Sequence, residues 1–376
     1  MPKEMEAYMF AIQGMSIAAM RTTDVQKLLG HDRREMIRHY QQATELALFR
    51  ADLLTTRHYW LFCALLYYLG FLFAIGQPEK ATALLGIASR LGMRMGLHLD
   101  PSLHSFSPWQ VEVRSRIWMY FLALDGPVFN CEGAESLFDT SWIPRARNAN
   151  DSQWPAHRFI KADQIPPDAE GFTDMTYPLM RIEWMCLLRE IRRMSKSSEP
   201  HKILSVISQF DAAMRRKFTN HMDKNDPMQV ICLKWHNCYF DEIRLHSDFK
   251  SALSGGAPYE NSDVLTRTVE MFEEIEKIEH LMLQHNWEWM IRWPPAFHSI
   301  ARLLHGLYTI PDHPEADRAW KQVDLIFRRY NNENFSMDNV PAWRVIERLC
   351  DKAMLTYSNR IRELTIKSFS TCFTLA

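Results

Sequence analysis

Glycine, proline and any excess of one charge are scarce in this sequence of 376 residues, and each shortage excludes a class of protein. The 13 glycines and 18 prolines make up about 8% of the chain, against an average of about 12%, which favours long helices over turn-rich sheets. The 44 Lys and Arg residues nearly balance the 45 Asp and Glu residues, so the whole chain lacks the positive charge of a dedicated nucleic-acid binder. Apolar residues recur at helical spacing, and no stretch alternates as a strand would.

The sequence therefore predicts an all-α fold, a large irregular helical domain of about ten to twelve helices with one long ordered loop in the middle. We expect helices over residues 6–20, 33–54, 59–75, 77–97, 107–129, 175–195, 202–222, 227–252, 259–285, 288–307, 315–330 and 341–362. A capped turn is expected at 22–30 and a polar loop at 331–339. The long loop spans 132–174, and its aromatic residues Trp142, Trp154 and Phe159 indicate that it packs on the surface. We expect a single domain over 1–376, because these aromatics imply a shared core.

The cysteines form neither a disulfide framework nor a zinc motif. The seven are Cys63, Cys131, Cys186, Cys232, Cys238, Cys350 and Cys372. Their odd number and the lack of CxxC spacing predict a reducing environment. Cys232, His236 and Cys238 share one expected helix, but buried thiols are favoured over metal ligands, since no second cysteine pair completes a tetrahedral site. We expect no cofactor in this chain.

Motifs of catalysis are also missing, and we expect that the protein is not an enzyme. No phosphate-binding glycine loop, HExxH or GxSxG occurs. His298 and His305 share a helix face without a third ligand, and the glutamates at 273–279 fit a solvated helix face. Small basic clusters at 192–196 and 215–217 fit either polar helix faces or part of a nuclear localisation signal.

One apolar run is long enough to raise the question of a membrane. Residues 59–75 read YWLFCALLYYLGFLFAI and carry no charge, which fits either a short membrane span or a helix buried on all sides. The flanking charges show no positive asymmetry that would orient a span. We expect a core helix and no membrane contact, with a membrane anchor as the alternative.

The most specific pattern lies in residues 81–154. A helix rich in Ala and Arg ends in Met95-Gly96-Leu97-His98, and the matching residues that follow are Asp100-Pro101, Phe106-Ser107-Pro108, Glu112, Arg114, Arg116, Ile117, Trp118, Asp125 and Asn148-Ala149-Asn150-Asp151. In order and spacing these resemble the regulatory region, or middle homology region, of fungal zinc-cluster transcription factors. The family signature covers 40–195, and a helical remainder follows over 196–376. Leu99, Met119 and the turn at 131–134 depart from the family pattern.

The resemblance implies a transcriptional regulator, or its regulatory domain, in the nucleus. It would act through protein partners of the transcription machinery or by sensing a small-molecule effector, and homodimer formation stays open. Family members carry a six-cysteine zinc cluster near the N-terminus that is not in this sequence. We therefore expect zinc only in a missing N-terminal cluster and no specific DNA binding by this chain alone. Either the chain is truncated or it is a regulator that lost its DNA-binding module. The alternative is a helical small-molecule-binding protein or enzyme with a pocket under the 132–174 loop.

The candidate site residues are those that carry the resemblance, namely Arg90, His98, Asp100, Arg114, Arg116, Trp118 and Asp125. Arg114, Trp118 and Asp125 fall near one stripe of the helix over 107–129. Asp125 lies about 16 Å along that helix from Arg114, so if it is buried it needs a partner elsewhere. Arg90 and Arg94 on the preceding helix are the expected partners, and the alternative is a hydrated Asp125 at the helix end.

Overall fold

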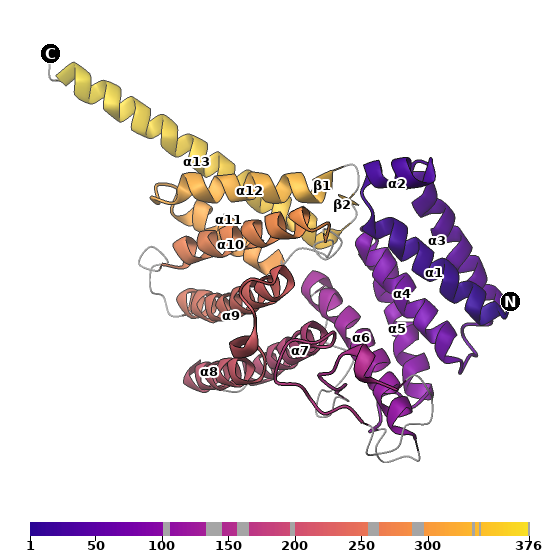
Figure 1. Ribbon diagram of the computed structural model, residues 1–376. Helices are drawn as coiled ribbons and strands as arrows, with labels where there is room; N and C mark the ends of the chain where they lie inside the picture. The colour runs from indigo at the N-terminus through magenta and orange to yellow at the C-terminus, as the bar shows by residue number, and fades with distance from the viewer. Residues whose placement is uncertain are drawn as a thin grey trace. The chain divides into compact units, whose positions relative to one another are not determined.

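The computed structural model describes residues 1–100, 106–132, 145–155, 165–195, 200–254, 263–287, 297–332, 335–337 and 340–374. Over these residues the fold is all-α, as the sequence predicted, with thirteen α-helices and one two-stranded antiparallel ladder (Figure 1). The helices are α1 Lys3–Ala19, α2 Thr22–Leu29, α3 Arg33–Arg50, α4 Tyr59–Ala74, α5 Pro78–Arg94, α6 Pro108–Glu132, α7 Thr176–Ser195, α8 Pro200–Lys217, α9 Pro227–Ser254, α10 Val264–Gln284, α11 Phe297–Thr309, α12 Ala316–Tyr330 and α13 Pro341–Thr374. Short 3₁₀ turns occur at Asp151–Gln153 and Thr219–His221.

Two compact units divide the chain. The first comprises Met1–Leu233 with Leu281–Pro294, and the second comprises Lys234–His280 with Pro295–Ala376. A single domain over 1–376 stays a prediction.

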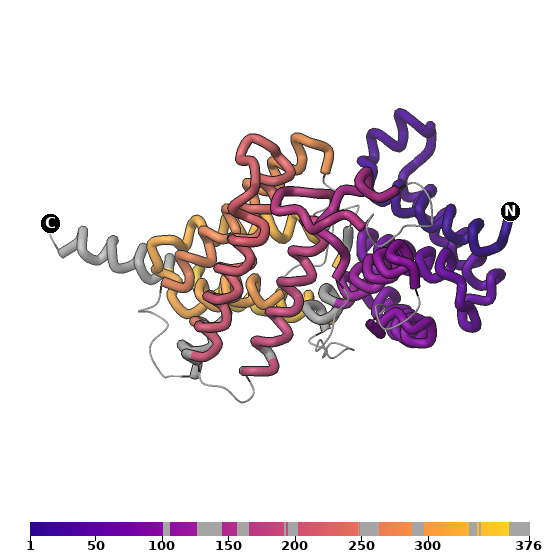
Figure 2. The backbone as a smooth tube through the Cα atoms, turned by 60° about the horizontal axis from the view of Figure 1, so that its bottom comes forward, coloured from indigo at the N-terminus to yellow at the C-terminus, as the bar shows by residue number. Residues whose placement is uncertain are grey.

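The apolar helix α4 is the centre of the first unit. Twelve of its 16 residues are buried, and α1, α3, α5 and α6 all pack against it. Helices α1 and α3 lie side by side near the N-terminus of the chain (Figures 1 and 2). Leu66 is 1% exposed, so this segment is a core helix, as expected from the family-like helices around it. Among the described residues, no helix has the length and apolarity needed to cross a membrane.

Local capping residues set several helix ends where the sequence placed them. Ser107 and Gln110 form a capping box at the start of α6, where a helix was expected from residue 107, with the Ser107 N–H donating to Gln110 Oε1 over 2.9 Å and the Gln110 N–H to Ser107 Oγ over 3.3 Å. Asp32 caps α3 by accepting from the Glu35 N–H at 3.0 Å. Gly96, with φ of +67°, closes α5 in the left-handed conformation that glycine adopts without strain.

Two short segments differ from the sequence-based expectation. Residues 22–29 form helix α2 where a turn was predicted, because the fully buried Val25 anchors the segment and Gly30 caps its C-terminus. In the expected polar loop, β1 (Asn331–Asn332) pairs with β2 (Phe335–Ser336). Met337 and Val340, at 0% and 4% exposed, hold the end of this hairpin against the core.

The second unit contains α11, α12, α13, β1 and β2 together with most of α9 and α10. Its largest fully buried side chain is Trp343 on α13, whose ring centroid lies 5.0 Å from that of Phe327, 5.8 Å from Tyr330 and 6.5 Å from Phe297. Helix α13 extends to Thr374, beyond the expected end at residue 362. The expected helical segments at 259–262 and 288–296 lie outside the described residues.

Candidate functional site

Helix α6 carries four of the seven candidate residues, and it buries three of them. Arg114, Trp118 and Asp125 are 6%, 2% and 3% exposed, on the stripe that the sequence indicated. Burying a guanidinium or a carboxylate is costly unless each finds a partner, so these contacts define what the residues do.

Arg114 caps the C-terminus of α5. Its Nη2 donates to the backbone carbonyls of Met95 at 3.0 Å and Gly96 at 2.8 Å, and its Nη1 donates to the Tyr59 hydroxyl. The guanidinium also lies over the Phe106 ring, 4.3 Å from its centroid. The negative end of the α5 dipole favours a cation at this position. Through its hydrogen bonds to Tyr59, Met95 and Gly96, Arg114 links α6 to α4 and α5.

Trp118 packs against Gly92 of α5, which has no side chain to obstruct the indole ring. Its ring stacks on Phe121 with centroids 4.7 Å apart, and a Cβ on Gly92 would lie only 2.7 Å from Trp118 Cζ3. The His98 ring lies 6.3 Å from Trp118. Trp118 is therefore a packing residue between α5 and α6.

Asp125 pairs with Arg189 of α7, and the expectation of Arg90 or Arg94 as its partner was wrong. Arg189 Nη2 donates to Asp125 Oδ2 at 2.8 Å. Arg90 is exposed, and Arg94 donates to the Thr56 carbonyl at 2.7 Å. The α6–α7 packing, which local sequence does not reveal, decides the pairing. The alternative of a hydrated Asp125 is also wrong, because α6 continues to Glu132.

The remaining candidates do not gather into one cluster. His98 and Asp100 follow the end of α5 and are half-buried, while Arg90 lies on the exposed face of α5. His98 Nδ1 is buried and has no hydrogen-bond partner within the described part of the chain.

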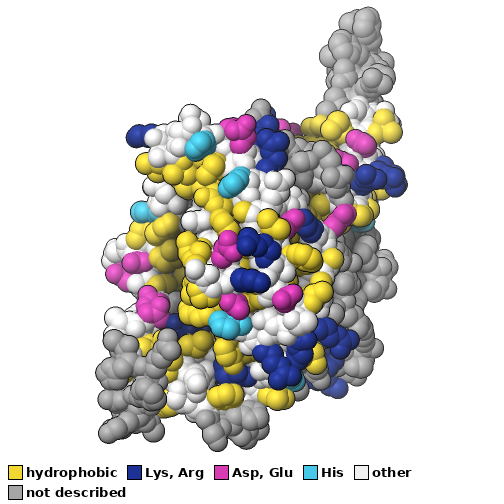
Figure 3. Space-filling model, turned by 90° about the vertical axis from the view of Figure 1, so that its right-hand side faces the viewer, with side chains coloured by type: hydrophobic (Ala, Val, Ile, Leu, Met, Phe, Trp, Pro, Cys, Tyr) yellow, Lys and Arg dark blue, Asp and Glu magenta, His cyan; other side chains and the backbone are white. Residues whose placement is uncertain are grey.

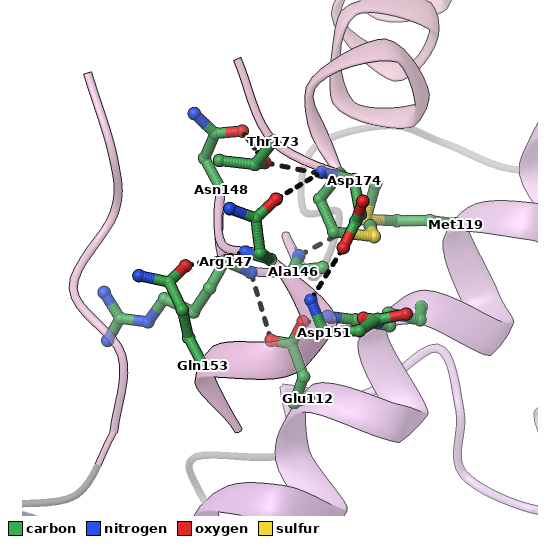
Figure 4. A network of polar contacts seen from close by, with 12 residues as sticks. Glu112, Met119, Ala146, Arg147, Asn148, Asp151, Gln153, Thr173 and Asp174 are labelled. Carbon is green, nitrogen blue, oxygen red and sulfur yellow. Dashed lines mark hydrogen bonds and ion pairs between the residues drawn. The ribbon is translucent and has the colours of Figure 1, made fainter. Parts of the chain in front are cut away.

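Arg116 joins α6 to the central loop. Its Nε contacts Glu112 Oε1 at 2.6 Å, and its Nη1 contacts Asp151 Oδ1 at 2.5 Å. Burial acts to lower the pKa of Arg116, but the two carboxylates outweigh it and raise that pKa. Glu112 and Arg116 are four residues apart, the spacing at which helical side chains pair, and Glu112 is buried at 3% exposed. Glu112 Oε2 also accepts from the Arg147 N–H at 3.0 Å (Figure 4).

Asn148 is the polar centre of the described loop, and sequence reasoning did not single it out as a site residue. Its Nδ2 donates to the carbonyls of Ala169 at 2.8 Å and Gly171 at 3.2 Å. Its Oδ1 accepts from the Thr173 hydroxyl at 2.8 Å (Figure 4) and from the Thr176 hydroxyl at 2.9 Å. All four hydrogen-bonding positions of this amide are thus filled. The Asn-Ala-Asn-Asp run was the available signal.

A second pair of contacts closes the same loop. The Asp151 N–H donates to Asp174 Oδ2 at 2.8 Å, and the Asp174 N–H donates to Asn150 Oδ1 at 3.1 Å (Figure 4). Trp154 is 7% exposed and meets the Trp109 ring edge-on, so this part of the loop packs as expected. Trp142 and Phe159 lie outside the described residues, as do residues 133–144 and 156–164 of the 132–174 loop, under which a pocket was considered.

The polar residues around α6 form hydrogen bonds and ion pairs with one another and with backbone groups. These contacts join α5, α7 and the described part of the loop to α6. Among the described residues, no group of three or more His, Cys, Asp or Glu side chains is placed to hold a metal ion. Cys232 and Cys238 are buried, and burial raises the pKa of each thiol to about 12, which keeps them protonated.

The second unit holds a buried ionic cluster that the sequence analysis missed. Arg302 is 0% exposed and donates through Nη2 to Glu242 Oε2 at 2.5 Å and through Nε to Thr268 Oγ1 at 3.0 Å. His298 Nε2 lies 2.9 Å from Glu242 Oε1, so this histidine has a carboxylate nearby. Burial opposes ionisation of Glu242, yet the contacts from His298 and Arg302 lower its pKa to about 2. The cluster ties α9, α10 and α11 together.

The acidic run on α10 is only partly solvated. Glu273 and Glu274 form ion pairs with Arg318 and Lys234, respectively. Glu279 is 7% exposed and contacts Arg329, so the expectation of a solvated face was wrong for this residue. Burial raises the pKa of Glu279 to about 7, despite the opposing effect of Arg329.

Comparison with known proteins identifies the family of this chain. Residues 7–244 match the family described as fungal specific transcription factor domain. This match spans more than half of the chain, and the chain belongs to that family.

Three relatives align with most of the chain. The aurofusarin cluster transcription factor aurR2 of Gibberella zeae is 26% identical over 88% of this chain and 50% of its own length. The pyriculol/pyriculariol biosynthesis cluster transcription factor 1 of Pyricularia oryzae is 24% identical over 94% of this chain and 51% of its own length. The C6 finger domain transcription factor hasF of Aspergillus fumigatus is 23% identical over 93% and 50%, respectively. The chain thus spans about half the length of these relatives.

Proposed function

We propose that this chain is the regulatory part of a transcriptional regulator that acts in the nucleus through protein partners, without catalysis and without specific DNA binding of its own. The family match over residues 7–244 carries the proposal. It covers α1 to α8 and enters α9, the helices that build the first unit. The buried polar groups on α6 support a regulatory rather than a catalytic role, because their partners are other parts of the same unit.

The names of two relatives support a narrower proposal about the target genes. One is named for the aurofusarin cluster and the other for the pyriculol/pyriculariol biosynthesis cluster, and both align with more than four fifths of this chain. We propose that the regulator to which this chain contributes controls genes of a biosynthetic cluster.

A tethering experiment tests the proposal. The chain is fused to a heterologous DNA-binding domain, and transcription of a reporter with the matching sites is measured in a fungal host. We expect a several-fold change relative to the DNA-binding domain alone, upward for an activator and downward for a repressor. The same fusion with Leu66→Asp should lose the effect, because an unpaired charge in the α4 core unfolds the first unit. An intact, nuclear fusion that leaves the reporter unchanged would contradict the proposal.

A further inference from the structure

Three exposed arginines from two segments meet on one surface of the first unit. Arg57 directly precedes α4, and Arg90 and Arg94 lie one turn apart on the same face of α5. The Arg94 Nη2 donates to the Thr56 carbonyl at 2.7 Å, which places the end of α5 beside Arg57. We call Arg57, Arg90 and Arg94 the arginine patch.

The arginine patch has no counter-charge of its own. Within the part of the chain that the structure describes, no ion pair joins any of the three to an acidic residue. Several exposed or half-buried arginines do have such pairs, among them Arg50 with Glu6, Arg147 with Asp168, Arg215 with Asp211 and Arg318 with Glu273, while others, such as Arg38 and Arg344, have none among the described residues. In a chain with a formal net charge of −1, a group of unpaired arginines is a local excess of positive charge.

Helix dipoles do not explain the whole patch. A cation is favourable at the C-terminus of α5, which accounts for Arg94. Arg57 precedes the N-terminus of α4, where the dipole disfavours a cation. The first turn of α4 has no acidic residue, and His58 makes no capping hydrogen bond with its side chain. Arg114 adds a further guanidinium beneath this surface, bonded to backbone carbonyls and to the Tyr59 hydroxyl.

Apolar side chains border the arginine patch. Tyr59, Met93 and Leu99 are 39%, 38% and 45% exposed. Tyr59 contacts Arg114, Met93 adjoins Arg94 in the chain, and Leu99 Cδ1 lies 3.7 Å from the position of a Cβ on Gly96. Figure 3 shows one face of the molecule, on which Lys and Arg side chains lie among exposed hydrophobic ones. The surface therefore offers both charge and apolar contact.

We infer that the arginine patch binds a protein segment in which acidic residues are interspersed with aromatic or aliphatic ones. Guanidinium groups bind carboxylates through paired hydrogen bonds, and the bordering Tyr59, Met93 and Leu99 bury apolar side chains of the same segment. Nucleic acid fits less well, because three arginines neutralise few phosphates and the net charge of the chain does not attract DNA over longer distances. The inference rests on the proposed function, for which it names the surface that holds a protein partner.

Fluorescence anisotropy with the purified full chain tests this inference. The probe is a labelled synthetic peptide of alternating Asp/Glu and Phe/Leu residues, and parallel titrations use two derivatives, one with Asn/Gln for the acids and one with Ser for the apolar residues. We expect the parent peptide to bind, and its affinity to fall at high salt. Each derivative should bind at least about tenfold more weakly than the parent peptide.

Two charge-matched variants locate the binding site. The patch variant combines Arg57→Gln, Arg90→Gln and Arg94→Gln, and the control variant combines Arg215→Gln, Arg216→Gln and Lys217→Gln at the exposed end of α8. Both lose three positive charges, and circular dichroism confirms that both are folded. We expect about a tenfold loss of peptide affinity in the patch variant and no more than about a twofold loss in the control variant.

Three results would overturn the inference. They are no binding of the parent peptide up to about 100 μM, equal losses in the two variants, and tighter binding of a DNA duplex that the patch variant abolishes. Each can occur while the tethered chain still changes reporter transcription. Conversely, the peptide can bind as expected while the reporter is unaffected, so failure of the docking surface and failure of the proposed function are distinguishable.

Discussion

Asp125 on α6 and Arg189 on α7 form a buried ion pair, with Arg189 Nη2 donating to Asp125 Oδ2 over 2.8 Å. The two side chains are 4% and 11% exposed and lie 64 positions apart in the chain. A buried pair of this kind contributes little net stability compared with an apolar pair, but removal of one partner leaves the other charge uncompensated. The pair therefore makes the packing of α6 against α7 sensitive to the loss of either partner.

Asp125→Asn should lower the free energy of unfolding by about 3–5 kcal/mol, because it leaves the Arg189 guanidinium buried without a counter-charge. Urea denaturation measures this change. Adding Arg189→Met should recover much of the loss. The control is Glu190→Gln, which breaks the exposed Glu190–Arg193 pair and should cost less than about 1 kcal/mol. Similar losses for Asp125→Asn and Glu190→Gln would refute the special role of the buried pair.

Two glycines of α5 should respond to alanine in opposite directions. At Gly92 the new Cβ would meet Trp118 Cζ3 at 2.7 Å and Phe62 Cζ at 3.2 Å, so α6 must shift. We expect Gly92→Ala to destabilise the protein by about 1–3 kcal/mol. At Gly86 a Cβ meets no atom within 4 Å, and Gly86→Ala should stabilise α5 by about 0.5–1 kcal/mol. The melting temperatures of both variants relative to the wild type test these opposite changes. A lower melting temperature for Gly86→Ala would contradict the packing described.

Asn148→Ala should loosen the described loop from the rest of the first unit. The substitution leaves the Thr173 and Thr176 hydroxyls and two backbone carbonyls without their partner, at a cost of about 2 kcal/mol or more. Limited proteolysis should then cleave within residues 145–176 much faster than in the wild type. Gln209→Ala, on the exposed side of α8, is the control. An unchanged cleavage rate for Asn148→Ala would show that the Asn148 network does not hold the loop.

Glu279 should make stability depend on pH near neutrality. Burial raises its folded-state pKa to about 7 from an ordinary value of 4.5. Between these two values the unfolded chain releases a proton that the folded chain retains, so stability falls as the pH rises from about 4.5 to 7 and levels off above that range. The contribution amounts to about 3 kcal/mol at most.

Glu279→Gln cannot lose this proton, so its stability relative to the wild type should rise over the same pH range. Urea denaturation at a series of pH values measures the difference. Glu270→Gln, at an exposed position of α10, controls for the loss of one negative charge. If the difference between Glu279→Gln and the wild type does not change with pH, Glu279 does not titrate in this range.

The starts of several helices followed from local sequence, whereas the end of α13, at Thr374 and not at residue 362, did not. Helix α6 starts where the sequence predicted a helix from residue 107, because the Ser107–Gln110 capping box involves only residues within one turn. The apolar run of α4 was also predicted correctly as a core helix, since a segment without a polar face must be buried by its neighbours. Residues 22–29 were misjudged because burial of Val25 against other helices outweighs the turn-forming residues around it.

The partners of the buried charges were decided by the tertiary structure alone. The sequence indicated that Asp125 would need a cation, but Arg189 was selected by the packing of α7, and Arg302 was matched with Glu242 over 60 positions of chain. Composition and helical period report which side of a helix is apolar, because that depends on neighbours three or four residues away. A buried carboxylate or amide instead depends on groups that only packing brings within hydrogen-bond distance, as the four bonds of Asn148 illustrate. The sequence by itself thus determined the helices and the family, and the tertiary structure decided which residues hold them together.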